Sequence, residues 1–195
     1  MNFLRNVLAL IGFISLIGLL FVVFNLQPAL KVADTFDEKA LDVYSQFFAK
    51  AFSSNSAIDA LVHKVRVQPG ISAAELERSI KSIADELNIK NVGELALSKQ
   101  VEAMSGKPYR YVKIYMLCTA MTAANMLNYN DAFSSFLPCR VSVVEDEHGV
   151  FWLYTMNLDL IIHGGKPIPP VLKTELMSVR DALNEIMNRS AVGDF

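Results

Sequence analysis

The 195-residue chain has few of the residues that build metal centres and disulfide scaffolds, since it contains two cysteines and three histidines. Two cysteines supply neither a disulfide framework nor a four-thiolate metal site. Basic residues are not in excess either, because 18 Lys and Arg stand against 20 Asp and Glu, for a net charge of -2. A protein that neutralises nucleic-acid phosphates needs a basic surplus, so we expect no nucleic-acid partner.

Catalytic motifs are also missing. The chain has no G-x-S-x-G nucleophile motif, and Gly164-Gly165-Lys166 lacks the spacing of a phosphate-binding loop. The C-x-x-C-H sequence that attaches haem covalently does not occur. Asp146-Glu147 and the pair Asp181 and Glu185 are typical of solvated acidic residues. We therefore predict no catalytic residues, no metal and no cofactor, and an enzyme is the less favoured class.

One long apolar run stands out, because Val7 to Phe24 contains a single polar side chain, Ser15. As a helix, these about 18 residues would be ~27 Å long, close to the ~30 Å hydrocarbon core of a bilayer. We interpret residues 1–30 as an N-terminal transmembrane anchor. A cleaved signal peptide is the alternative, but the run is longer than the usual ~7–15 residue core, and residues 27–33 lack a small-x-small cleavage site.

Basic residues near the run bear on its orientation. Arg5 precedes it, and Lys31 and Lys39 follow it among acidic residues, so the two sides nearly balance. A short positive N-terminus that stays inside is the commoner arrangement. We expect a single-pass protein of the bacterial inner membrane, with most of the chain on the periplasmic or extracytoplasmic side.

Residues 31–57 are expected to form a helical spacer. Thr35 or Asp34 can cap a helix that runs to about Phe52. Apolar residues at helical spacing give this helix an aromatic stripe: Phe36, Ala40, Tyr44, Phe47, Phe48, Ala51 and Phe52. The stripe either packs on the following domain or, through helix 36–52, binds a membrane-protein partner or a second copy in a homodimer. Its polar face lacks the Lys and Arg of a helix that lies on lipid.

Residues 58–195 are expected to form one domain. Alternating or apolar runs predict strands at 58–67, 92–101, 109–117, 140–145 and 150–156. A capping box at Ser72-Ala73-Ala74-Glu75, Thr119 as an N-cap and the apolar spacing in 171–188 predict three helices. This order gives a two-layer α+β domain with one mixed, largely antiparallel sheet, whose face bearing His63 and Val65 is covered by helices.

The stretch from Phe136 to Asp146, followed by a glycine turn and Trp152 to Asn157, resembles domain-of-unknown-function family 302. The resemblance covers about Leu61 to Met187 and is most specific at Leu137-Pro138-Cys139-Arg140. It implies a small α/β domain that tends to form homodimers, and it supplies no established reaction. This chain has Cys118-Thr119 where the family usually has an Asn-Pro pair, so any role of that pair is in doubt here.

Cys139 leaves three interpretations open. It is a small buried hydrophobe, a reactive or ligating thiol whose thiolate Arg140 favours, or a disulfide partner of Cys118. If the strands that end at Cys118 and begin at Cys139 are parallel, the two residues lie at opposite sheet ends, too far apart for a disulfide.

The other candidate binding residues are two histidines and a methionine. His63 is expected to be a hydrogen-bonded core imidazole, and His163, next to two glycines, to lie in a solvated loop, with an anion or metal as the alternative ligand. A haem held by either histidine with Met156 or Met116 is chemically possible. The leading hypothesis is a binding or assembly module of an envelope complex. The rival is a redox or metal- or haem-binding protein that uses Cys139.

Overall fold

Five strands form one antiparallel sheet in the computed structural model, which describes residues 2–33 and 35–195. The strand order is β1-β5-β4-β3-β2. The strands are β1 (Val62–Arg66), β2 (Lys90–Leu95), β3 (Val112–Cys118), β4 (Cys139–Glu145) and β5 (Phe151–Met156). The predicted α+β class with one sheet and covering helices is confirmed. Each neighbouring pair is antiparallel, so the expected parallel component of a mixed sheet is not found among the described strands.

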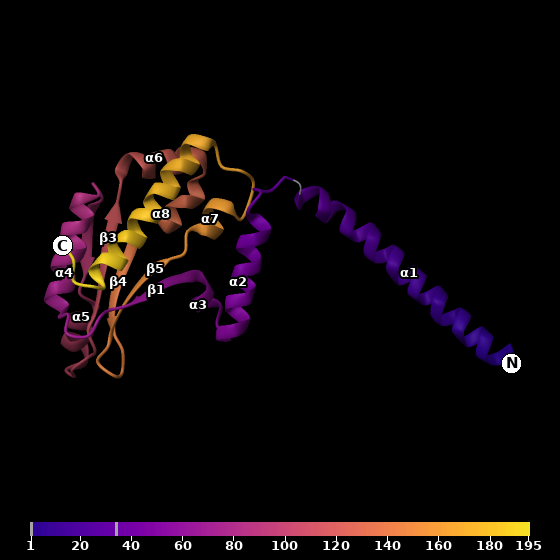
Figure 1. Ribbon diagram of the computed structural model, residues 1–195, viewed down its shortest axis with the longest axis horizontal. Coiled ribbons are helices and arrows are strands. Elements are labelled where there is room, and N and C mark those ends of the chain that lie inside the picture. The colour runs from indigo at the N-terminus through magenta and orange to yellow at the C-terminus, as the bar shows by residue number, and fades with distance from the viewer. Residues whose placement is uncertain (1, 34) are drawn as a thin grey trace.

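Helices α4 and α8 pack side by side over one face of this sheet (Figure 1). The helices of the described residues are α1 (Asn2–Ala33), α2 (Ala40–Ser54), α3 (Ala57–Leu61), α4 (Ala73–Glu86), α5 (Leu97–Ser105), α6 (Ala120–Tyr129), α7 (Asp159–His163) and α8 (Pro170–Ser190), with a 3-10 helix over Asp131–Phe136. The C-terminal helix α8 therefore packs over strands that precede it in the sequence, and so connects the two ends of the domain.

The sequence of α4 specifies both its start and its buried face. The Ser72 hydroxyl accepts a hydrogen bond from the Glu75 backbone at 3.3 Å, and the Glu75 carboxylate accepts one from the Ser72 backbone at 2.7 Å. This capping box was predicted and is confirmed. Leu76, Ile80 and Ile83 follow at helical spacing and are fully buried.

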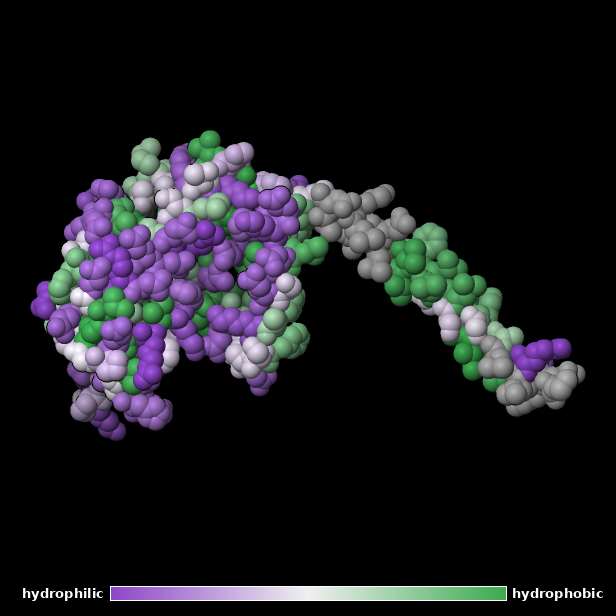
Figure 2. Space-filling model, viewed as in Figure 1, coloured by the Kyte–Doolittle hydropathy of each residue, from purple (hydrophilic) through white to green (hydrophobic). Residues whose placement is uncertain are grey.

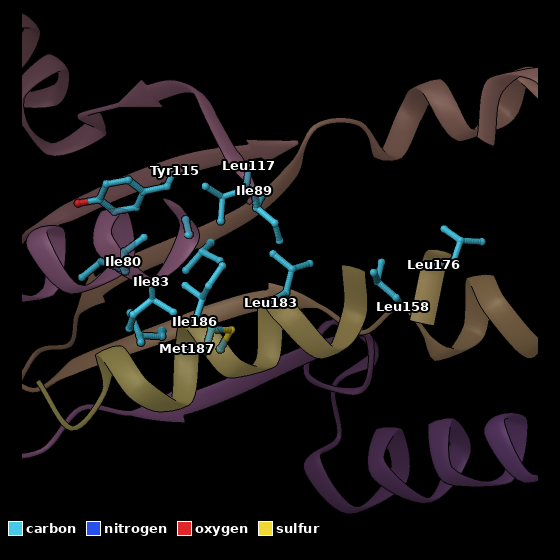
Figure 3. Close-up of a cluster of buried hydrophobic side chains, with 14 of the residues drawn as sticks. Ile80, Ile83, Ile89, Tyr115, Leu117, Leu158, Leu176, Leu183, Ile186 and Met187 are labelled. Atoms are coloured by element: carbon cyan, nitrogen blue, oxygen red, sulfur yellow. The ribbon is translucent and has the colours of Figure 1, made fainter. Parts of the chain in front are cut away.

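The core between helices and sheet is apolar (Figure 3). Leu183, Ile186 and Met187 on α8 point toward Tyr115 and Leu117 on β3. Alternate residues of the strands supply the other side of this layer, because neighbouring side chains of a strand point to opposite faces. Burial of each such large side chain stabilises the fold by about 1.5–3 kcal/mol, so this layer holds the sheet in place.

Four boundaries differ from the sequence-based prediction. Residues 58–61 belong to α3, because the Ser56 hydroxyl accepts a hydrogen bond from the Asp59 backbone at 3.2 Å and caps a short helix. The predicted strand 92–101 ends at Leu95, and α5 follows. Residues 159–163, of which only His163 was assigned, to a loop, form α7. The spacer helix α2 begins at Ala40 with Lys39 as its N-cap, so Thr35 does not cap it; Asp34 lies outside the described residues.

The N-terminal helix α1 differs from the rest of the molecule in its surface. Its segment Arg5–Phe24 is the one stretch within residues 2–33 and 35–195 that is long and apolar enough to cross a bilayer, and none of it is buried. Figure 2 shows the coloured part of this helix as mainly hydrophobic, whereas the visible face over α4 and α8 is mainly hydrophilic. A membrane anchor and a signal sequence share this length and composition.

Candidate functional site

An apolar groove lies at the end of the sheet where β4 and β1 begin and β5 ends. Its volume is about 540 Å³, within the range of about 300–1,000 Å³ usual for small-molecule sites. The residues that line it are Ile58, Leu61, Val62, Phe136, Pro138, Cys139, Arg140, Ser142, Tyr154, Thr155, Met156, Asn157, Leu158, Leu160, Ile161 and Leu183. Segments far apart in the sequence, from α3 to α8, therefore meet around one concave surface.

Three of the five predicted binding residues, Cys139, Arg140 and Met156, line this groove. A fourth, His63, lines a smaller cavity of about 90 Å³ beside it, also lined by Asn157, Asp159, Arg180 and Asn184 among others. The two spaces share lining residues on β5 and α8, Met156 among them. The structure thus brings four of the predicted residues into one region, while His163 lies elsewhere.

Arg140 is the one charged residue among the groove's lining residues. Its side chain is exposed, and among the described residues no carboxylate lies within ion-pair distance of its guanidinium. Its backbone carbonyl accepts a hydrogen bond from the Thr155 hydroxyl at 2.8 Å, which ties the start of β4 to the end of β5. The backbone of Arg140 is therefore fixed at the groove, and its positive charge has no counter-charge among the described residues.

His63 is not the hydrogen-bonded core imidazole that was expected. It lies opposite Thr155 in the pairing of β1 with β5, and its buried Nε2 has no hydrogen-bond partner among the described residues. Arg180, which shares the small cavity, is already paired with Asp159 at 3.0 Å. A buried polar atom without a partner is uncommon in folded proteins and marks this cavity as a place where water or a ligand atom is accommodated.

The environment of Cys139 favours the thiol over the thiolate. Burial raises the pKa of Cys139 to about 11, and the nearby Arg140 only partly opposes this. A thiolate is the reactive and metal-binding form, so a thiol that stays protonated near neutral pH is a weak nucleophile and a weak ligand. Its packing against the core agrees with the interpretation of a small buried hydrophobe.

The prediction that Cys118 and Cys139 lie at opposite ends of the sheet was wrong. It assumed parallel strands, but β3 and β4 are antiparallel, and Leu117 lies opposite Cys139 in their pairing. The two cysteines therefore lie at the same end of the sheet, where they border a common small cavity. Both are free thiols in the structure.

His163 ends α7 and is buried, so the expectation of a solvated loop residue was wrong. Only 3% of its surface is exposed, and its Nδ1 lies 2.9 Å from Oδ1 of Asp37. The other carboxylate oxygen of Asp37 accepts a hydrogen bond from Lys173 of α8. We call Asp37, His163 and Lys173 the Asp37 cluster. His163 does not line the groove.

The charge state of the Asp37 cluster follows from its contacts. Burial alone would raise the pKa of Asp37, but hydrogen bonds from Lys173, the Lys39 backbone and His163 outweigh burial and lower it to about 2. Asp37 is therefore a carboxylate, which can only accept hydrogen bonds, so Nδ1 of His163 must carry the proton between them. We interpret this paired carboxylate as a residue that stabilises the fold.

The Asp37 cluster attaches the segment that follows α1 to the domain. The Asp37 backbone N–H donates to the Gly165 carbonyl at 2.8 Å, and the Tyr44 hydroxyl donates to the Gly164 carbonyl at 2.6 Å. The start of α2 is thus packed against the loop between α7 and α8. The aromatic stripe divides accordingly, since Ala40 is buried, whereas Phe48 and Phe52 are 52% and 82% exposed.

A second charged group lies between α4 and strands β2 and β3. Lys81 and Lys113 each contact both Glu77 and Glu94, at 2.6–2.8 Å. These four residues neutralise one another, so they add no free charge to a site. Across residues 2–33 and 35–195, no group of three or more His, Cys, Asp and Glu side chains is placed to hold a metal ion.

Sequence reasoning missed several residues of this region. Ile58 and Leu61 were assigned to a strand, and Asp37 and Lys173 were not singled out. The signal for α3 was the N-capping Ser56 with Asp59 three residues later. Nothing local marks Asp37 and Lys173 as partners, because 136 positions separate them in the sequence.

The fold and the groove define a small two-layer α+β domain with a ligand-sized pocket. A family model described as "Domain of unknown function DUF302" matches residues 63–190. The chain belongs to this family. The match supplies the fold without a reaction, as the resemblance in the sequence had implied.

One solved structure with the same fold is the uncharacterized conserved protein DUF302 from Bacillus stearothermophilus. It is 16% identical in sequence, with a TM-score of 0.55, and the alignment covers 67% of this chain and 98% of the other. At this identity the likeness shows the fold alone. No curated protein matches the chain.

Proposed function

We propose that this chain is a single-pass, membrane-anchored binding module whose ligand site is the groove at the end of the sheet. The observation that carries the proposal is the groove itself: it is concave, of ligand size, and lined largely by apolar residues with one charged side chain. No general acid–base pair or nucleophile with its base borders it. Binding is therefore the activity that the groove supports.

Membrane attachment through α1 is the first part of the proposal. Arg5–Phe24 has the length and composition of a span, and the domain begins only a short distance further on, where Asp37 is bound to the α7–α8 loop. Membranes extracted with carbonate should retain the protein, and its intact mass should include Met1. A mature chain that begins near Ala33, or that is released by carbonate, would show a cleaved signal sequence instead.

The side of the membrane is the second part. We place the domain on the extracytoplasmic side of a bacterial inner membrane, as the commoner arrangement for a short N-terminus that bears Arg5. A protease added to intact spheroplasts should then digest the domain. Digestion only after the cells are lysed would place the domain in the cytoplasm.

Photolabelling tests the groove directly. The full chain in phosphatidylcholine nanodiscs would be irradiated with hexadecanol that carries a diazirine in its chain, and labelled peptides would be mapped by mass spectrometry. We expect labels on peptides that contain Ile58, Pro138 and Leu160. Leu160→Trp should fill the groove and lower this labelling several-fold, whereas Leu127→Trp, on α6 and outside the groove, should not. Labels confined to α1 would rule the groove out as a site.

The exposed face of α2 supports the assembly part of the hypothesis. Leu41, Phe48 and Phe52 are 78%, 52% and 82% exposed, and Figure 2 shows hydrophobic residues along the outer side of this helix. Apolar side chains gathered on a helix next to a tether are typical of a contact with another membrane protein. A photo-crosslinking amino acid at position 52 should capture such a partner or a second copy in native membranes, and one at exposed Met104 should not.

The redox and metal alternative rests on Cys139, and its environment weakens it. A thiol with a pKa of about 11 has little thiolate at neutral pH. An absorption spectrum and metal analysis of the protein purified from native membranes test this alternative. A haem band or bound metal that is lost in Cys139→Ser would favour it over the binding module.

A further inference from the structure

We propose that the ligand of the groove is a single alkyl chain with an anionic head, a fatty carboxylate or a lysolipid phosphate, whose head binds Arg140. This inference rests on the proposed function and adds the chemical class of the ligand. Two features of the groove point to an amphiphile rather than to a purely apolar molecule. They are its largely apolar lining and the uncompensated charge of one arginine in that lining.

The apolar wall of the groove comes from helices and loops. Phe136, Leu160 and Ile161 belong to it, and so do Ile58 and Leu61 of α3. These side chains offer no hydrogen bonds, and burial of an alkyl chain against them is favourable in proportion to the apolar area removed from water. The affinity for the apolar part of a ligand therefore depends on the apolar area that it buries. Any hydrocarbon chain of suitable size meets this requirement.

The polar wall lies on the sheet face opposite the core. Arg140 and Ser142 are alternate residues of β4 and so point to the same face, and Tyr154 lies directly opposite Ser142 on β5. A guanidinium and two hydroxyls thus gather on one side of the groove. Burial raises the pKa of the Tyr154 phenol, with smaller contributions from Asp59 and Asp146, so this hydroxyl stays protonated and can donate.

The charge of this wall selects an anion. Arg140 is the one charged lining residue, and no carboxylate among the described residues pairs with it. A guanidinium presents parallel N–H groups that match the two oxygens of a carboxylate or phosphate, and such charge-assisted pairs are stronger than neutral hydrogen bonds. A neutral alcohol would leave the positive charge without a counter-ion, so it should bind more weakly than an acid of the same chain length.

An apolar path leads from the groove toward the anchor. Ile58 and Leu61 line the groove and are 75% and 42% exposed. The helix that contains them packs against α2, where Phe52 is 82% exposed, and the other end of α2 follows the segment that leaves α1 (Figure 1). Phe52 lies at the end of α2 away from the tether, and Phe48 and Leu41, 52% and 78% exposed, continue along the helix toward its start. An alkyl chain that leaves the lipid would thus meet exposed apolar side chains along α2 up to the groove.

The test compares an acid and an alcohol with the same chain. The full chain in phosphatidylcholine nanodiscs would be photolabelled with diazirine-bearing palmitate or with diazirine-bearing hexadecanol over a range of concentrations. We expect palmitate to label the groove peptides at about tenfold lower concentration. Arg140→Gln should abolish this difference by weakening palmitate alone, Arg140→Lys should retain most of it, and Arg66→Gln, an exposed arginine of β1 outside the groove, should leave it unchanged.

Unlabelled competitors identify the source of the anionic head. Competition by palmitate at lower concentration indicates a free fatty acid, and competition by palmitoyl lysophosphatidate at lower concentration indicates a lysolipid; either result supports the inference. Equal labelling by acid and alcohol, or palmitate labelling that Arg140→Gln does not change, overturns the anionic head and leaves the groove as an apolar site. Labels from both probes confined to α1 overturn the groove as well. Circular dichroism would show that each variant is folded.

Discussion

The chain uses a histidine and a cation at two places, and the two places differ in how fully those groups are paired. In the Asp37 cluster, the carboxylate contacts both His163 and Lys173, and its two oxygens are occupied. In the small cavity beside the groove, Nε2 of His63 has no partner among the described residues, and in the groove Arg140 has no counter-charge among them. Similar residue types therefore serve two purposes within one domain.

This difference distinguishes polar groups that stabilise the fold from polar groups that are available to a ligand. Desolvated polar groups cost free energy unless they are hydrogen-bonded, so a fully paired cluster is retained because it fixes the position of α2. Unpaired polar groups contribute favourable free energy only when another molecule supplies the missing hydrogen bond or counter-charge. We therefore expect substitutions in the Asp37 cluster to lower the free energy of unfolding, and substitutions in the groove to change it little.

Loss of the carboxylate from the Asp37 cluster should give the largest effect. In Asp37→Asn, Lys173 and His163 lose a charged acceptor, and because Lys173 is partly exposed, we expect a loss of about 2 kcal/mol rather than the larger value for fully buried pairs. Amide hydrogen exchange of Val43 and nearby residues of α2 should become about 30-fold faster, since 1.4 kcal/mol corresponds to a factor of ten. The exposed neighbour Glu38→Gln is the matched control. Equal exchange in the two variants would show that the cluster does not hold α2.

The same carboxylate predicts a pH dependence. The pKa of Asp37 falls from 3.8 to about 2 in the folded protein, which corresponds to about 2 kcal/mol of stability. A carboxyl group with a lowered pKa stabilises the fold above its ordinary pKa, and this stability disappears as the pH falls from about 4 toward 2. Thermal unfolding in phosphatidylcholine vesicles, followed by circular dichroism, should therefore separate wild type from Asp37→Asn at pH 6 and bring them together near pH 2.

The carboxylate of Glu94 titrates in the same pH range as Asp37. The effect of Asp37 must therefore be measured as the difference in stability between wild type and Asp37→Asn. Burial opposes the shift of Glu94, but hydrogen bonds from Lys113, Lys81 and Asn91 lower its pKa to about 2. Wild type and Asp37→Asn share this group, and subtraction removes its contribution. A gap between the two proteins that stays constant down to pH 2 would contradict the assignment to Asp37.

The fold was largely predictable because its signals are local. The capping box of α4 and the apolar spacing of α4 and α8 specify helices without reference to the rest of the chain, and Gly149, with φ of 75°, occupies the turn between β4 and β5. The errors arose where short elements depend on context, as in α3 and α5. In α3, the Ser56 N-cap overrides an apolar pattern that also fits a strand, and α5, which lacks a side-chain N-cap, ends at Gly106 with φ of 67°.

The groove and the Asp37 cluster were only partly predictable, because they depend on long-range pairing. Cys139 and Arg140 were identified from a compact motif, and His63 and Met156 as possible ligands. Their proximity follows from the order β1-β5-β4, which the sequence pattern did not specify. His163 was misplaced for the same reason, since its partner Asp37 is 126 positions away.

The two histidines should respond in opposite ways to the same substitution. His63→Phe removes a buried nitrogen that has no protein partner, so we expect unchanged stability or a gain of up to about 1 kcal/mol. His163→Phe removes one of the two hydrogen bonds that Oδ1 of Asp37 accepts, leaves the one from the Lys39 backbone, and should cost about 1–3 kcal/mol. Thermal unfolding of both variants at pH 7 provides the measurement. A clear loss of stability in His63→Phe would show that its Nε2 is hydrogen-bonded by water or a ligand in the small cavity.

Removal of the groove's charge should have the smallest effect on stability. Arg140 has no ion pair among the described residues, and the contact that ties β4 to β5 uses its backbone carbonyl, which Arg140→Gln preserves. A surface substitution of this kind usually changes the free energy of unfolding by less than about 0.5 kcal/mol. Thermal unfolding of wild type, Arg140→Gln and Asp37→Asn side by side should place the first two together and the third well below. If Arg140→Gln were as unstable as Asp37→Asn, Arg140 would be a structural residue, and the contrast between the paired cluster and the open groove would no longer hold.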